Sequence, residues 1–276
     1  MIKDLIVNVT IGEGPDVAGP YAISIAETFD AHAGAVAFVY DPVIPPSVMG
    51  GIPASLIEDQ RAENEKSATD ALAKFEAAAK RSGISFESRS VAASLAGASD
   101  SFGAMARRFD LAVVGQAEPG IAAPEELIVE GALFGSGRPV VVVPYIQKSG
   151  VRLDRVMVCW DGSRNAARAI ADAMPFLTRA KQVEVVTVAT DGTPDDSMAG
   201  LYIAHHLSRH DVIVEVRNIV AHGQDVSLRI RSHAAQYSAD LIVMGGYGHS
   251  WLREFILGGA TRDILESTVV PTLMSH

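Results

Sequence analysis

Cysteine, aromatic residues and basic charge are all scarce in this sequence of 276 residues. Cys159 is the single cysteine, so no disulfide can form within the chain. The opening residues do not have the pattern of a secretion signal, and we expect a cytoplasmic protein. The longest apolar runs, such as Arg138 to Tyr145, fall well short of the roughly 20 residues that a membrane-spanning helix needs. The sequence thus predicts no membrane partner.

The shortage of basic side chains argues against a nucleic-acid partner. The chain carries 33 acidic and 23 basic side chains, a net charge of −10. Residues 1–150 hold 19 acidic and 11 basic side chains, so −8 of this charge lies in the first half. Nucleic-acid binders usually present a basic face. A small anion is still compatible with this charge, because backbone amides at a helix start can hold one.

Short runs rich in Val and Ile alternate with longer amphipathic stretches along the whole chain, a pattern typical of βαβ units with strands buried on both faces. The predicted strands are Asp4–Thr10, Gly34–Tyr40, Ser85–Val91, Asp110–Gly115, Pro139–Pro144, Arg155–Trp160, Gln182–Ala189, Val212–Val220, Asp240–Gly245 and Val269–Met274. The predicted helices are Val17–His32, Ser55–Ser82, Ala98–Phe109, Pro124–Gly135, Ser163–Arg179, Ser197–His210, Asp225–Tyr237 and Ala260–Ser267.

The two halves of the chain repeat one plan. The segment FDLAVVG at residues 109–115 corresponds to ADLIVMG at 239–245. Near the end of each half a second apolar run follows, RPVVVVP at 138–144 and VVPTLM at 269–274. We expect two α/β domains, residues 1–148 and 151–276, joined at Gln147–Gly150. An extra Pro- and Gly-rich stretch, Asp41–Asp59, fits a long surface loop in the first domain.

The second half places candidate ligand-binding residues directly after two predicted strands. Asp161 follows the first strand of that half, and a glycine-dense segment, residues 244–261, follows the fourth. In an open parallel sheet this edge is where ligands bind, and glycines let a backbone approach a phosphate closely. Two alternatives stay open: Asp161 could form a helix cap or Asx-turn, and the glycines a tight loop.

This pattern resembles the universal stress proteins. The spacing Gly245-x2-Gly248-x9-Gly258 is similar to their ATP-binding segment, and VCWDGS at residues 158–163 is similar to their first-strand signature. The resemblance implies two tandem doubly wound domains, each a five-stranded parallel sheet of order 3-2-1-4-5, as in the adenine nucleotide α-hydrolase-like fold. It also implies an adenine nucleotide, ATP, as the ligand. The implied binding residues are Asp161, Gly245, Gly248, His249, Gly258, Gly259 and Thr261.

One position departs from the family pattern. Gly259 stands where the family has Ser or Thr, and the loss of one hydroxyl removes roughly 1 kcal/mol of hydrogen bonding. Thr261 could replace that hydroxyl. The first half has lost the pattern altogether, with Thr10 in the place of Asp161 and Glu118 and Pro119 after Gly115. We interpret the first half as a degenerate partner, with a site for a different ligand as the alternative.

Other candidate residues give weaker signals. His205, His206 and His210 do not all share a helix face, which favours a solvated surface over a metal site. Arg253 and Glu254 fit a solvated pair, with a phosphate contact from Arg253 as the alternative. Cys159 lies between apolar neighbours, which favours an inert core residue over a nucleophile. Neither a Ser-His-Asp grouping nor a P-loop is visible, and we expect no catalytic residue or metal ligand.

The function that the sequence favours is a cytoplasmic stress-response protein that binds ATP in its second half as a regulatory ligand. A ligand-free interaction module and an ATP-using enzyme of the same fold class are the alternatives. We expect the last strands of the two halves to pair, because each is otherwise an exposed sheet edge. The result is an intramolecular version of the family's dimer. A homodimer of the full chain and a signalling protein are further partners that the resemblance allows.

Overall fold

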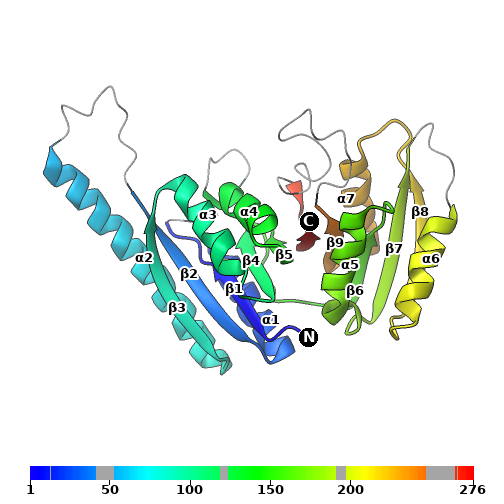
Figure 1. Cartoon of the computed structure of the whole chain (residues 1–276), viewed down its shortest axis with the longest axis horizontal. Coiled ribbons are helices and arrows are strands. Elements are labelled where there is room, and N and C mark those ends of the chain that lie inside the picture. The colour runs from blue at the N-terminus through cyan, green and yellow to red at the C-terminus, as the bar shows by residue number, and fades with distance from the viewer. Residues whose placement is uncertain (13, 42–52, 119–123, 191–196, 247–264, 266) are drawn as a thin grey trace.

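A computed structural model describes residues 1–12, 14–41, 53–118, 124–190, 197–246, 265 and 267–276 (Figure 1). The first half contains β1 (Asp4–Asn8), α1 (Ala18–Phe29), β2 (His32–Tyr40), α2 (Ala54–Ser82), β3 (Phe86–Ala93), α3 (Leu95–Ala106), β4 (Leu111–Gly115), α4 (Pro124–Gly135) and β5 (Val140–Val143). The second half contains β6 (Arg155–Cys159), α5 (Arg164–Leu177), β7 (Gln182–Ala189), α6 (Ser197–Ser208), β8 (Val214–Val220), α7 (Val226–Tyr237), β9 (Leu241–Gly245) and β10 (Thr272–Ser275).

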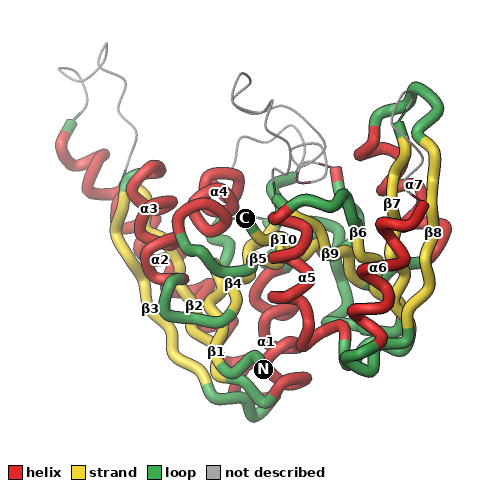
Figure 2. The backbone as a smooth tube through the Cα atoms, turned by 45° about the vertical axis from the view of Figure 1, so that its right-hand side comes forward, coloured by secondary structure: helices red, strands yellow, loops and turns green. Residues whose placement is uncertain are grey.

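The described strands form one ten-stranded sheet in the order β3-β2-β1-β4-β5-β10-β9-β6-β7-β8. Within each half all pairs are parallel, and each half follows the order 3-2-1-4-5. In Figure 2 the strands of both halves lie between helices. The predicted fold class, two tandem doubly wound α/β units, is confirmed.

The two halves meet through their last strands, as the sequence predicts. β5 and β10 pair antiparallel, with Val141 opposite Leu273, and they lie between the halves in Figure 1. All four residues of β5 and of β10 are buried. The pairing therefore covers two strands, the apolar β5 and the half-polar β10, that would otherwise form exposed sheet edges.

The expectation that every strand is buried on both faces is wrong for β3 and β8. These strands are the two outer edges of the sheet, and several of their residues are exposed. β8 begins with alternating apolar and polar residues, VEVR, and β3 has four consecutive polar residues, ESRS, so both fit strands that meet water on at least one face.

The hydrophobic core consists of two clusters, one on each face of the sheet, and both extend through the two halves. One cluster joins α1 and α2 to α5, and the other joins α3 and α4 to α7. The rings of Phe29 on α1 and Phe176 on α5 meet edge to face with centroids 4.9 Å apart. The two halves thus share a core on each side of β5 and β10.

The repeat seen in the sequence is also a repeat of contacts. Asp110, just before β4, accepts a hydrogen bond from the backbone N–H of Lys3 at 2.8 Å. Asp240, just before β9, accepts one from the backbone N–H of Arg155 at 2.9 Å. Each aspartate thereby ties the fourth strand of its half to the start of the first strand.

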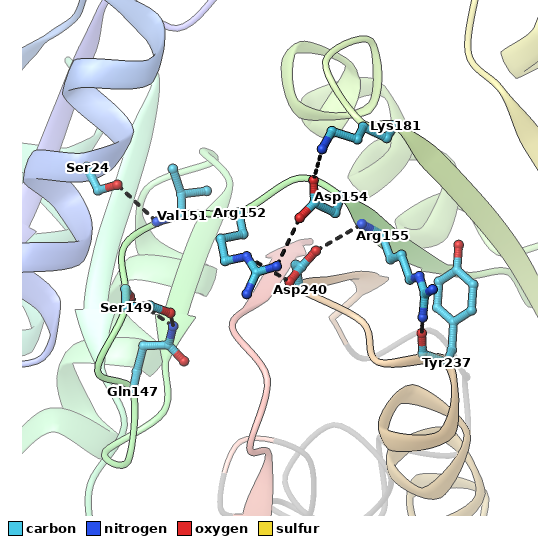
Figure 3. A network of polar contacts seen from close by, with 10 residues as sticks. All are labelled: Ser24, Gln147, Ser149, Val151, Arg152, Asp154, Arg155, Lys181, Tyr237 and Asp240. Atoms are coloured by element: carbon cyan, nitrogen blue, oxygen red, sulfur yellow. Dashed lines mark hydrogen bonds and ion pairs between the residues drawn. The ribbon is translucent and has the colours of Figure 1, made fainter.

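The segment between the halves is fastened at both ends (Figure 3). The Gln147 amide donates to the carbonyl of Ser149 at 2.9 Å, and the N–H of Val151 donates to Ser24 Oγ on α1 at 3.0 Å. Arg152 then pairs with Asp154 and with Asp240 of the second half. Residues 147–150 thus lie between a contact with α1 and the ion pairs at the start of the second half.

Some predicted boundaries need correction, each for a local reason. The first helix ends at Phe29 and not at His32, because Asp30 adopts a left-handed conformation with φ 52°. The third helix begins at Leu95, three residues before the predicted start, because the Ser94 hydroxyl caps it. The last strand begins at Thr272 and not at Val269, since Pro271 has no N–H to donate.

The third helix also ends at Ala106, three residues before the predicted Phe109. Other boundaries shift by one or two residues, and the strand at 182–189 and the helices at 124–135 and 226–237 lie where they were expected within one residue. The predicted surface loop Asp41–Asp59 runs into α2 from Ala54 onward. Residues 42–52 and most of the predicted helix Ala260–Ser267 lie outside the described residues.

Candidate functional site

The candidate site lies at the carboxyl ends of β6 and β9. β6 pairs with β7 on one side and with β9 on the other, so this is where the strand order of the second half reverses. Asp161 follows β6 by two residues, and Gly245 is the last residue of β9. The structure therefore brings these two predicted residues to the same edge of the sheet.

Asp161 forms the turn between β6 and α5. Its Oδ1 accepts a hydrogen bond from the backbone N–H of Ser163 at 2.9 Å, and Gly162 has a φ of 75°, in the left-handed region that favours glycine. Ser163 in turn caps α5, because its Oγ accepts from the N–H of Ala166 at 3.1 Å. The Asx-turn considered from the sequence is therefore present, and it holds an exposed carboxylate at the switch point.

Gly245 is needed for packing. A Cβ at this position would lie 2.6 Å from the backbone N of Ala166 and 2.6 Å from the carbonyl carbon of Asn165. The end of β9 thus touches the first turn of α5 directly. The absence of a side chain at Gly245 has a structural cause that is independent of any ligand.

Asn165 is a site residue that the sequence analysis missed. Its buried amide Nδ2 donates to the carbonyl of Gly246 at 2.5 Å, which fixes the backbone where residues 247–264 begin. The signal was a polar residue on the apolar face of a helix, since Asn165 shares that buried face with Ala169 and Ala173. A buried amide at such a position needs a partner.

The other predicted ligand-binding residues lie outside the described residues. These are Gly248, His249, Gly258, Gly259 and Thr261, together with the candidates Arg253 and Glu254.

Comparisons with known proteins agree on the family of the second half. Residues 152–276 match the universal stress protein family. Residues 152–276 form a universal stress protein domain. A universal stress protein of Synechocystis sp. is 27% identical over 138 residues, which cover 49% of this chain and 46% of that protein. This chain thus matches about half the length of that relative.

Solved structures show the same fold over both halves. A universal stress protein from Archaeoglobus fulgidus matches with a TM-score of 0.73 at 17% identity, covering 99% of this chain and 95% of that one. A protein of unknown function from Pseudomonas aeruginosa matches with a TM-score of 0.63 at 12% identity, covering 99% and 92%. These likenesses show that the first half shares the tandem fold.

The first half contacts the universal stress protein domain next to the candidate site. A Cβ on Gly246 would lie 3.0 Å from a methyl of Leu133 on α4. Reciprocally, the Gln116 amide after β4 donates to the carbonyl of Leu265 at 2.8 Å. In each half the segment after the fourth strand therefore touches the region before the last strand of the other half.

The structure describes the remaining histidine and cysteine candidates of the second half. His205, His206 and His210 are exposed at the end of α6, and no group of three potential metal ligands occurs among the residues that the structure describes. Burial, with a smaller effect of the Asp161 carboxylate, raises the pKa of Cys159 to about 12, so its thiol is protonated at neutral pH. No helix in the described parts of the chain combines the length and apolar character needed to cross a bilayer.

Proposed function

We propose that the second half binds an adenine nucleotide, ATP, as a regulatory ligand. The observation that carries this proposal is the family match of residues 152–276 combined with the position of Asp161 at the switch point of that half. The glycine spacing that follows β9 supports a phosphate-binding segment between the two strands. Gly248, His249, Gly258, Gly259 and Thr261 are the proposed contacts beside Asp161 and Gly245.

Two structural features support this assignment: the cap at the start of α5 and the hydrogen bond at the end of β9. Ser163 caps α5 with a neutral hydroxyl, while the Asp161 carboxylate accepts from the N–H of Ser163 itself. The Asn165 amide holds the carbonyl of Gly246, so the chain leaves β9 in a defined direction. Both features suit a loop that must present backbone amides to a phosphate.

We further propose that the nucleotide is bound and released with little turnover. The segment 244–261 contains a single acidic residue, Glu254, and the sequence shows neither a Ser-His-Asp grouping nor a P-loop. A release assay for phosphate or pyrophosphate separates this proposal from the enzyme alternative. Sustained release at a rate above about one per second would favour an enzyme.

Titration calorimetry of the full chain with ATP tests the binding proposal. We expect about one nucleotide per chain, because the first half lacks the pattern and carries most of the negative charge. Gly248→Asp should abolish the signal, since it places a carboxylate where the phosphates are expected. Gly14→Asp is the matched control in the first half: a side chain there has open space, so ATP binding should persist.

Two results would contradict the proposal. A stoichiometry near two, or loss of binding in Gly14→Asp, would assign the nucleotide to the first half. No binding by wild-type protein, together with no nucleotide released on denaturation of freshly purified protein, would favour the ligand-free interaction module.

A further inference from the structure

The first half contains a cavity of about 290 Å³ at the carboxyl ends of its strands. Its lining includes Asn8 at the end of β1, Tyr40 at the end of β2, Gln116 after β4 and Tyr145 after β5. β1 pairs with both β2 and β4, so the cavity lies at the switch point of the first half. Its position corresponds to the candidate site of the second half, but its chemistry is different.

Two carboxylates line this cavity, and one of them is buried. Glu118 is exposed, whereas Glu125 in the first turn of α4 is only 9% exposed. The Glu125 charge lies close enough to Asp16 and Tyr40 to act on both. The described lining contains no Lys, Arg or His. The described lining thus carries negative charge and no basic side chain, so this cavity is suited to a positively charged ligand.

The field of Glu125 acts on two neighbouring groups. Burial is the main cause of the raised pKa of Asp16, and the Glu125 charge raises it further. Burial and Glu125 likewise raise the pKa of Tyr40 above its usual range, so Tyr40 remains a neutral phenol. The same negative field that disfavours ionisation of these groups favours a cation in the cavity.

Asn8 supplies an unsatisfied acceptor at the same place. Its side chain is 3% exposed and lines the cavity, and its Oδ1 has no hydrogen-bond partner among the described residues. Buried amide oxygens in folded proteins are normally hydrogen-bonded. A ligand with N–H donors offers a partner on this side of the cavity.

The start of α1 is closed to anions. The Asp16 carboxylate accepts hydrogen bonds from the backbone N–H of Gly19 at 3.1 Å and of Thr10 at 3.4 Å. The chain's own carboxylate thus occupies the helix N-terminus that would hold a phosphate in a nucleotide site. The corresponding helix of the second half is capped by the neutral Ser163.

We propose that the first half binds a small organic cation, an amine or amidinium attached to a flat apolar body. The charged group pairs with Glu125 and faces Asn8, while Val9, Phe38 and Tyr145 provide apolar walls for the body. The volume lies at the lower end of the range for small-molecule sites, which favours a ligand with about ten non-hydrogen atoms. The degenerate half is then a second site with the opposite charge preference.

Calorimetry and ligand-observed NMR on the full chain test this proposal with phenethylamine, tyramine and benzamidine as cations. The matched anion is 3-phenylpropanoate, which has the same ring on a chain of similar length. We expect at least one cation to bind with a dissociation constant of about 0.1–1 mM, as for other ligands of this size, and the anion not to bind. Binding of the anion as strongly as the cations, or binding of none of them, would overturn the proposal.

Two variants locate the binding. Glu125→Gln should weaken the cation about tenfold or more, whereas Glu126→Gln, the exposed neighbour on α4, should leave it unchanged. Asn8→Leu removes the unpartnered amide, so it should keep the protein folded by thermal melting and still weaken the cation. Unchanged affinity in both Glu125→Gln and Asn8→Leu would show that the cation binds elsewhere.

Discussion

The side-chain amide of Asn165 donates a hydrogen bond of 2.5 Å to the backbone carbonyl of Gly246. This bond connects the first turn of α5 to the end of β9, across the point where the strand order of the second half reverses. It fixes the backbone at Gly246, the last described residue before the glycine-rich segment.

Replacing Asn165 with Ala should lower both stability and nucleotide affinity. The loss leaves a buried carbonyl without its partner, which costs about 1–3 kcal/mol of unfolding free energy. Urea denaturation measures the first effect and ATP calorimetry the second. Asn64→Ala is a matched control, since the Asn64 amide also donates to a backbone carbonyl, that of Tyr40, but in the first half. Equal loss of ATP affinity in both variants would argue against a local role of Asn165.

Phe176→Ala should destabilise the whole chain by about 3–5 kcal/mol, because this buried ring contacts Phe29 across the two halves. Denaturation should stay a single cooperative transition in the wild type, and the variant should show either a lower midpoint or two separate transitions. Phe134→Ala is the control: its ring is 49% exposed, so we expect about 1 kcal/mol or less. A large effect at Phe134 and none at Phe176 would contradict the shared core.

Two aspartates at helix starts should give opposite dependences of stability on pH. Burial raises the pKa of Asp16 above its usual 3.8, so the folded state binds the carboxyl proton more tightly than the unfolded chain does. The free energy of unfolding therefore falls as pH rises from 3.8 through the raised pKa. A hydrogen bond from the Ser227 hydroxyl, helped by backbone amides, lowers the pKa of Asp225. The contribution of Asp225 to stability is present above pH 3.8 and is lost as pH falls through its lowered pKa.

Denaturation of Asp16→Asn and Asp225→Asn between about pH 3 and about pH 7 tests both signs. Relative to wild type, Asp16→Asn should gain stability as pH rises, and Asp225→Asn should lose it. If both variants showed the same dependence of unfolding free energy on pH, neither pKa shift would contribute to stability.

Cys159 should resist alkylation in the folded protein. With a pKa of about 12, its thiolate fraction at about pH 8 is lower than that of a free thiol by a factor of ~1000. Iodoacetamide labelling followed by mass spectrometry should be slow in native protein and fast in guanidinium. Rapid labelling without denaturant would indicate an accessible, activated thiol.

The fold was largely predictable because its signals are local and repeated. Runs such as residues 111–115 and 241–245 are apolar on both faces, which identified central strands, and the repeat offset identified two units. The edge strands β3 and β8 were misjudged because burial depends on sheet position, which a single strand's sequence does not state. The end of α1 depends on the left-handed conformation of Asp30, and the start of α3 depends on the capping hydroxyl of Ser94. Several residue types can adopt either role, so the sequence did not identify these two boundaries.

The site was less predictable than the fold. Asp161 stood out because an acidic residue followed a buried strand, but the packing role of Gly245 needs the position of α5. Asn165 and Glu125 were missed because each lies in the first turn of a helix, where polar residues are common and exposed. For Asn165, the burial comes with its contact to Gly245 and Gly246, the latter 81 residues away in the chain.

The short turn at Gln147–Gly150 joins two units that pair along β5 and β10, and this makes their association independent of dilution. Tethered partners meet at an effective concentration of the order of millimolar, whatever the abundance of the chain. In a symmetric dimer of two identical chains, the same surface of each chain forms the interface. Every substitution in that surface would therefore change both sides of the interface. In the fused chain each unit can change alone, so the surroundings of the two switch points can carry different charge.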